Sequence, residues 1–300
     1  MNEENIEKQV GIIKSVLYKN LMENYVPFQI DRDIASRWAK PLNVPRGGKT
    51  ILYTSFMYQM GSLFKSYEKY IPTFGSLGSS RIISSIGSKL IRAKSEDIQR
   101  AGKILSNIYN ILRRYDPDLG YLYEDEPYSG ALLYEMGFLE EFNNYGRKLM
   151  EFFKKKGVER IITVDPHTTN SLNNMKKSIG FSIPFVSYLN VIQDVRGEGK
   201  FVFHDSCLYS RFLGMYNDIR ATIKNTGVVL VEDPTVTGIG NGFCCGAPVG
   251  PVDSRLSDRI AQSRADNLKT LNENILVACP LCYANLSPFG HVVDIAEVIS

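Results

Sequence analysis

All five cysteines of this 300-residue chain lie in its last third, and their spacing constrains the fold more than any other feature. Thirty-six residues separate Cys207 from the adjacent pair Cys244 and Cys245. A further 33 residues lead to Cys279 and Cys282, which form a C-x-x-C pair. A disulfide framework normally spreads its cysteines along a small secreted chain. An adjacent pair combined with a C-x-x-C pair instead indicates thiolates that gather around a metal.

Composition and charge favour an ordinary soluble protein with reduced thiols. The net charge is only +3 and the basic residues are scattered, so we expect no nucleic-acid partner. No stretch reaches the roughly 18 apolar residues of a membrane span, and the polar N-terminus is unlike a secretory signal. We therefore expect a cytoplasmic location and no transmembrane segment. Attachment to a membrane through a partner is compatible with this expectation.

Strands and helices alternate along the chain, which predicts an α/β fold with parallel sheets after an N-terminal helical segment. Ser254 is expected to cap the helix that follows it, and Gly157 fits the C-terminal end of another. Strands are expected at 50–56, 160–164, 200–204, 228–231 and 275–278, and helices at 6–25, 31–40, 62–70, 95–115, 133–156, 213–225, 255–272 and 294–299. A turn at 165–170, which begins with Asp165-Pro166, is expected to open a further helix.

The chain contains an internal repeat, so we expect two tandem Rossmann-like halves. Three blocks of the first half match three blocks of the second, and similar distances separate the last two blocks in each half. The matched blocks are 51–56 with 202–207, 128–131 with 244–247, and 165–168 with 279–282. This predicts an N-terminal helical and linker segment at 1–45, a cysteine-free α/β domain at 46–196, and a cysteine-rich α/β domain at 197–300.

Only the second half has side chains that bind a soft metal. The five cysteines are replaced in the first half by Phe56, Tyr128, Ser129, Asp165 and Thr168. Asp165 and its neighbour His167 could bind zinc if further strong ligands lay nearby. A half that serves packing and docking is the favoured interpretation.

The cysteine blocks follow predicted strands, and the carboxyl ends of parallel strands meet at one crevice. Thiolates are soft ligands that select zinc, Cu(I) or iron–sulfur clusters. A single structural zinc takes four ligands, whereas five cysteines with two adjacent suit a centre of several irons. Zinc and unliganded buried cysteines remain alternatives. Arg211 and Arg255 are candidates to add positive charge, and His204 is either a proton donor or a structural histidine.

The motifs around these cysteines resemble those of the "CCG" cysteine-rich domain of heterodisulfide reductase subunits B and D. The resemblance extends over residues 46–300, is strongest after residue 200, and rests on residues 204–207, the Cys244-Cys245-Gly246 run and residues 278–282. It implies a non-cubane 4Fe-4S cluster held by Cys207, Cys244, Cys245, Cys279 and Cys282.

The resemblance also implies a redox subunit that performs electron transfer and thiol/disulfide chemistry, with no catalytic residue identified. A ferredoxin-like iron–sulfur subunit and a flavoprotein subunit are the implied partners. The alternative is a non-catalytic scaffold subunit of a respiratory or sulfur-oxidising complex, stabilised by zinc or a cluster.

Overall fold

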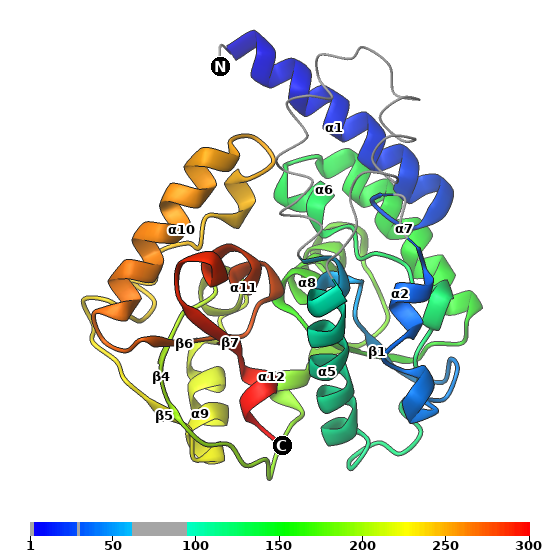
Figure 1. Cartoon of the computed structure of the whole chain (residues 1–300). Coiled ribbons are helices and arrows are strands. Elements are labelled where there is room, and N and C mark those ends of the chain that lie inside the picture. The colour runs from blue at the N-terminus through cyan, green and yellow to red at the C-terminus, as the bar shows by residue number, and fades with distance from the viewer. Residues whose placement is uncertain (1–2, 29–30, 62–94) are drawn as a thin grey trace.

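The computed structural model describes residues 3–28, 31–61 and 95–300, and in this part of the chain helices surround two parallel β-sheets (Figure 1). The helix expected over 62–70 lies outside the described residues. The two sheets belong to the first and second halves of the chain, which confirms the α/β class and the tandem Rossmann-like arrangement.

The first sheet has the order β1-β2-β3, and all its strands are parallel. They are β1 (Thr50–Tyr53), β2 (Arg160–Thr163) and β3 (Phe185–Ser187). Next to β1, the chain at Gly120 forms a parallel bridge with Ile51. Apart from their first residues, β1 and β2 are buried, because helices cover the sheet on both faces.

The second sheet repeats this order as β5-β4-β6-β7. Its strands are β4 (Lys200–Phe203), β5 (Val229–Leu230), β6 (Asn274–Val277) and β7 (His291–Asp294). Strand β4 pairs with β6 as β1 pairs with β2, and β5 flanks β4 where the chain at Gly120 flanks β1. The two halves therefore share a topology as well as sequence blocks.

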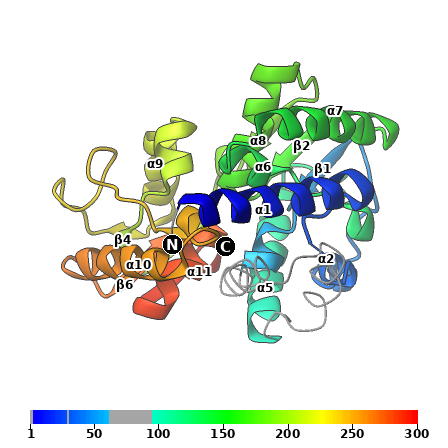
Figure 2. The same ribbon diagram turned by 90° about the horizontal axis from the view of Figure 1, so that it is seen from above.

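Helices of the first half cover its sheet on one side and join it to the N-terminal segment. They are α6 (Ala131–Glu135), α7 (Leu139–Lys155) and α8 (Pro166–Ile179). Helix α1 (Glu3–Asn24) lies along α7, where Lys14 pairs with Glu141 at 3.1 Å (Figure 2). A short helix α2 (Asp33–Ser36) and a 3₁₀ turn (Lys40–Leu42) replace the single helix expected at 31–40.

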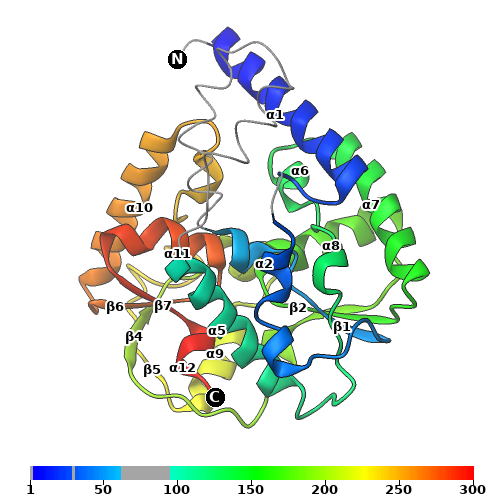
Figure 3. The ribbon, with the colours of Figure 1, turned by 45° about the vertical axis from the view of Figure 1, so that its right-hand side comes forward.

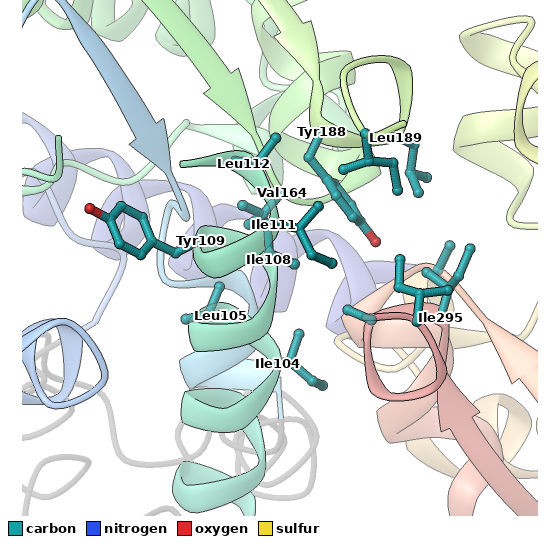
Figure 4. Packing of buried hydrophobic residues seen from close by; sticks show 14 of the residues in the cluster. Ile104, Leu105, Ile108, Tyr109, Ile111, Leu112, Val164, Tyr188, Leu189 and Ile295 are labelled. Carbon is teal, nitrogen blue, oxygen red and sulfur yellow. The ribbon is translucent and has the colours of Figure 1, made fainter. Parts of the chain in front are cut away.

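Helix α5 (Ser95–Leu112) of the first half lies beside α12 (Ile295–Val298) at the C-terminus (Figure 3). The apolar side of α5 joins one cluster with residues of both halves, including Tyr188 and Ile295 (Figure 4). Asn107 on α5 donates hydrogen bonds to the carbonyl oxygens of Ala296 and Ile299 at 2.7 and 2.6 Å. The two halves therefore share a hydrophobic core.

Three further sequence expectations were wrong in detail. The helix expected over 133–156 is broken into α6 and α7, because Gly137 adopts a left-handed φ of +80° that ends the first of them. Helix α10 (Ser254–Lys269) is capped by Asp253 and not by Ser254, since the Asp253 carboxylate accepts from the Leu256 amide. Helix α9 (Tyr216–Thr226) also begins later than expected.

Candidate metal centre

The five cysteines occupy the ends of strands β4 and β6 and one long loop between them. Cys207 follows β4 and begins a π-helical turn at Leu208–Phe212. Cys279 follows β6 and is the N-cap residue of α11 (Pro280–Leu286), whose first turn carries Cys282. Cys244 and Cys245 lie in the loop that precedes α10. All five are free thiols: Cys207 and Cys244 are half-buried, and the other three are buried.

The five sulfur atoms form one connected group. Hydrogen-bond contacts join Cys207 to Cys244, Cys244 to Cys245, Cys245 to Cys282, and Cys282 to Cys279. Residues up to 75 positions apart in the sequence (282 minus 207) are thereby brought to a single place. The convergence follows from the parallel sheet, whose strand ends lie at one edge.

The loop that carries the adjacent pair is held by the backbone. Gly246 has a left-handed φ of +89°, and its amide donates to the Cys244 sulfur at 3.4 Å. Asn285 on α11 donates to the Cys245 carbonyl at 2.6 Å, and Ser257 on α10 donates to the Gly246 carbonyl at 3.0 Å. These bonds fix the two neighbouring thiols against both helices.

Crowding of the thiols determines their protonation. Contact with Cys244 and then burial raise the pKa of Cys207, while contacts with neighbouring thiols raise the pKa of Cys245 and Cys282. Hydrogen bonds from Cys207 and Cys245 lower the pKa of Cys244. Burial opposes ionisation of Cys279, but its hydrogen-bond partners outweigh burial and lower its pKa. Ionising all five thiols at such short range would require a cation, which a metal centre supplies.

His204, left open between two roles by the sequence, belongs to this site. It is buried, and one of its ring nitrogens forms a group with the Cys245 and Cys282 sulfurs in which all three atoms lie within 4.8 Å of one another. Its Nδ1 accepts from Arg264 Nε at 3.3 Å, and burial followed by the Arg264 charge lowers its pKa to about 3. A neutral ring that accepts at Nδ1 carries its proton at Nε2, so it presents a donor to the sulfurs.

The positive charge beside the thiols comes from a residue that sequence reasoning missed. Arg264 is buried on α10, and burial lowers its pKa, while the charges of Asp205, Cys282 and Cys245 offset part of this effect. Of the two arginines expected in this role, Arg211 is exposed and donates to the Gly242 carbonyl, and Arg255 is exposed on α10. Arg264 lies among apolar residues on the buried side of α10. An arginine within such an apolar helix face was the sequence feature that could have indicated its role beside the thiols.

Asp205 lies just after β4 and binds to neighbouring segments that carry or flank the thiols. Arg220 binds its two carboxylate oxygens at 2.6 and 2.9 Å, and the Gly238 amide donates to the same carboxylate at 2.9 Å. The π-helical turn is held in the same way, because the Ser210 hydroxyl donates to Asp205. The loop that contains Gly238 is therefore held against the end of β4.

In the first half, the residues at the cysteine positions are all buried and offer no sulfur. Phe56 and Tyr128 fill space as expected, and Asp165 is the N-cap of α8, accepting from the Thr168 amide at 2.9 Å. His167 does not join Asp165 in a metal site, since both of its ring nitrogens already have partners. The possible zinc site is therefore not assembled here.

The donor set of the second half fits an iron–sulfur centre. It offers five soft sulfur ligands with no disulfide among them. Two buried nitrogen atoms of the site, His204 Nε2 and Arg264 Nη2, have no hydrogen-bond partner within the part of the chain that the structure describes. Thiolates with N–H donors around them are the usual environment of an anionic iron–sulfur cluster. Among the helices that the structure describes, none has the length and hydropathy that crossing a membrane requires.

Comparison with known proteins finds a family match and several relatives. Residues 201–287 match the family of the cysteine-rich domain, CCG. The chain is 27% identical over 230 residues to the EtfAB:quinone oxidoreductase of Syntrophomonas wolfei, which covers 67% of this chain and 32% of that protein. It is 27% identical over 201 residues to a protein of Bacillus subtilis described as the probable iron-sulfur-binding oxidoreductase FadF, covering 62% of this chain and 28% of that one.

A third relative, described as a probable membrane-anchored ferredoxin of Chromohalobacter salexigens, is 26% identical over 232 residues, which cover 67% of this chain and 34% of that protein. The matched part thus spans about a third of the length of each of these relatives. The chain resembles iron–sulfur oxidoreductases in that part.

Proposed function

We propose, from the membership of residues 201–287 in the CCG family of cysteine-rich domains, that this chain is the iron–sulfur redox unit of a heterodisulfide-reductase-like complex. The single observation that carries the proposal is the connected group of five free thiols. Cys207, Cys244, Cys245, Cys279 and Cys282 are its proposed ligands, and a non-cubane 4Fe-4S cluster is the proposed group. When bound, such a cluster supplies or accepts single electrons.

The chain's own residues orient and shield this centre. Cys245, Cys279 and Cys282 are buried, so water is excluded from that side of the group. Cys207 and Cys244 are half-buried, and the large apolar side chains that follow and precede them, Phe212 and Phe243, are each 63% exposed. A partner or a disulfide substrate would therefore approach on the side of Cys207 and Cys244.

Zinc is the less favoured occupant, because the nitrogen nearest the thiols is not a free lone pair. The Arg264 guanidinium donates to Nδ1 of His204, so Nε2 carries the proton. The group of His204, Cys245 and Cys282 then offers two sulfur ligands for a metal and one hydrogen-bond donor. A donor next to thiolates supports an anionic cluster better than a Cys/His zinc site.

We also propose the domain limits 1–45, 46–196 and 197–300. The first half is proposed to pack against the second half and to provide a docking surface for partners. A ferredoxin-like iron–sulfur unit is the proposed partner, on the same polypeptide or a separate one, and a flavoprotein of the EtfAB kind is the proposed electron donor or acceptor. These partners are suggested by relatives described as EtfAB:quinone oxidoreductase and as a ferredoxin. A cytoplasmic location, with attachment to a membrane through a partner, completes the proposal.

Replacing Cys245 with serine tests the function against the scaffold alternative. Catalysis by the thiol group predicts that Cys245→Ser loses electron transfer and thiol/disulfide turnover while assembly with partners is intact. Ser129→Ala is the matched control, since Ser129 holds the equivalent position in the first half and its hydroxyl has no partner among the residues that the structure describes. Loss of assembly with unchanged turnover per assembled complex would favour the scaffold.

A further inference from the structure

A histidine of the cysteine-free half reaches across to a sulfur of the cysteine-rich half. His167 Nε2 lies 3.3 Å from the Cys279 Sγ, although the two residues are 112 positions apart. On the other side of the ring, His167 Nδ1 lies 2.6 Å from Glu135 Oε1. The result is a buried Glu–His–Cys line that joins the two halves at the thiol group.

The elements of the first half hold this line rigidly. His167 lies in the first turn of α8, which begins after Asp165 and is fixed by the hydrogen bond from the Thr168 amide to that carboxylate. Glu135 is the last residue of α6, which packs on α8. At the matching position of the second half the residue is Leu281, so the first half alone supplies an imidazole at this place.

Donor and acceptor counting fixes the direction of the bond to sulfur. An ionised Glu135 carboxylate only accepts, so it takes the proton of Nδ1. Once Cys279 holds a metal, its thiolate also only accepts, because the thiol proton has been released. The contact at 3.3 Å is then a hydrogen bond only if Nε2 donates.

We propose that the Glu135–His167 pair donates a hydrogen bond to the Cys279 sulfur and thereby raises the reduction potential of the centre in the second half. This inference rests on the proposed function, since it concerns the same thiol group. His167 is a positioning and tuning residue and takes no part in bond making. The cysteine-free half would thus have a role in the redox site that its lost thiols do not suggest.

The expected rise in the reduction potential follows from the charge of the centre. Reduction adds an electron to a centre that is already anionic, and a donor aimed at a ligand sulfur stabilises the added charge. Burial strengthens this effect because no water competes at the sulfur. The side chain of His167 is 5% exposed and that of Glu135 is 15% exposed, so the pair acts in a shielded place.

Redox titration of the iron-loaded full chain, followed by electron paramagnetic resonance, tests the inference. His167→Met keeps the volume and removes the donor, and we expect its midpoint potential to be lower than that of the wild type. His167→Gln keeps an N–H donor, and we expect a potential closer to the wild-type value. His291→Gln is the matched control, because His291 is exposed at the start of β7 and contacts Asn274.

Each result decides the question. A wild-type potential in His167→Met, or equal shifts in the Met and Gln variants, would overturn the inference. If His167→Met fails to bind iron while His167→Gln binds it at a potential near that of the wild type, the hydrogen bond is needed to keep Cys279 among the ligands, which supports the inference. Failure of both to bind iron assigns His167 to packing and overturns it.

Failure of the proposed function is visible separately. Wild-type protein that carries zinc in place of iron would show this in metal analysis before any variant is compared, and both proposals would then fall. Iron-loaded wild type with no shift in His167→Met would remove only the role of the histidine.

Discussion

Gly246 shows how one residue controls the geometry of the thiols. Its φ of +89° lies in the left-handed region, and a Cβ there would stand 2.8 Å from the Ser257 carbonyl oxygen. The first half keeps a glycine with the same conformation at the matching place, Gly130, where a Cβ would meet the Tyr145 ring at 2.9 Å. This close approach is a property of the repeat and not of the metal site alone.

We predict that Gly246→Ala destabilises the folded protein by about 1–3 kcal/mol, since it adds backbone strain and a clash. Because the strained loop carries Cys244 and Cys245, iron binding should weaken as well. Denaturant unfolding and metal analysis measure the two effects. Gly240→Ala is the control in the same loop, as no atom lies within 4 Å of a Cβ there. Equal stability of the two variants would contradict the prediction.

The buried carboxyl group of Asp294 makes the folding stability of the protein depend on pH. It is fully buried, and burial raises its pKa to about 7, above the value of roughly 4 that it has in an unfolded chain. The folded state therefore holds a proton that the unfolded state has released at pH 4–7. The stability that this group contributes is present in full below about pH 4 and is lost as the pH rises to about 7.

Asp294→Asn removes this titration and keeps an oxygen that can cap α12. Its free energy of unfolding, relative to that of the wild type, should rise between pH 4 and 7 by up to about 1.4 kcal/mol per pH unit. Asp253→Asn is the control, since that cap is solvent-exposed and the Leu256 amide lowers its pKa. A pH-independent difference for Asp294→Asn would exclude a raised pKa.

At the scale of elements, α5 and α12 are joined by one side chain. Asn107 satisfies two carbonyl oxygens at the end of α12. We predict that Asn107→Ala costs about 1–3 kcal/mol, because two partly buried acceptors lose their donor. Thermal or denaturant unfolding measures this cost. Gln99→Ala on the same helix, which removes an exposed contact with Ser95, should be near neutral, and a neutral Asn107→Ala would contradict the account.

The sequence predicted most of the elements but missed strands β3 and β7. Length is not the reason, since β1 and β2 are similarly short and were predicted; no distinctive sequence pattern marks the two missed strands. Helix α11 was missed for a different reason. Asp165-Pro166 was interpreted as a helix start, whereas the matching Cys279-Pro280 was considered only as a ligand block, although proline in the first turn favours a helix in both. Consistent use of the repeat would have predicted α11.

The candidate site was predictable in part because it depends on strand ends. Cysteines placed after β4 and β6 had to lie at one edge of a parallel sheet. Arg264 and His167 were not assigned there and the role of His204 was left open, because these roles depend on which way a side chain points and on packing between distant segments. No sequence distance indicates that His167 meets a sulfur 112 residues away.

At the scale of the whole molecule, the two halves form one folding unit. Tyr58 in the first half donates to Asp294 in the second at 2.9 Å, and the shared cluster includes Tyr209, Ile295 and Ile299 together with α5. A fragment of residues 197–300 would expose this apolar surface to water. We predict that it lacks the cooperative unfolding of the full chain, as measured by calorimetry and near-ultraviolet circular dichroism. Cooperative unfolding of a fragment with full iron content would contradict a shared core.

The proposed function requires that five sulfurs of the second half bind iron together. Iron and acid-labile sulfide analysis of the full chain, purified without oxygen, is the decisive measurement. We expect about four irons and about four sulfides per chain, as for a 4Fe-4S cluster, with a marked loss in Cys279→Ser and none in Ser129→Ala. Zinc without iron, or iron content unchanged by Cys279→Ser, would contradict the proposed function.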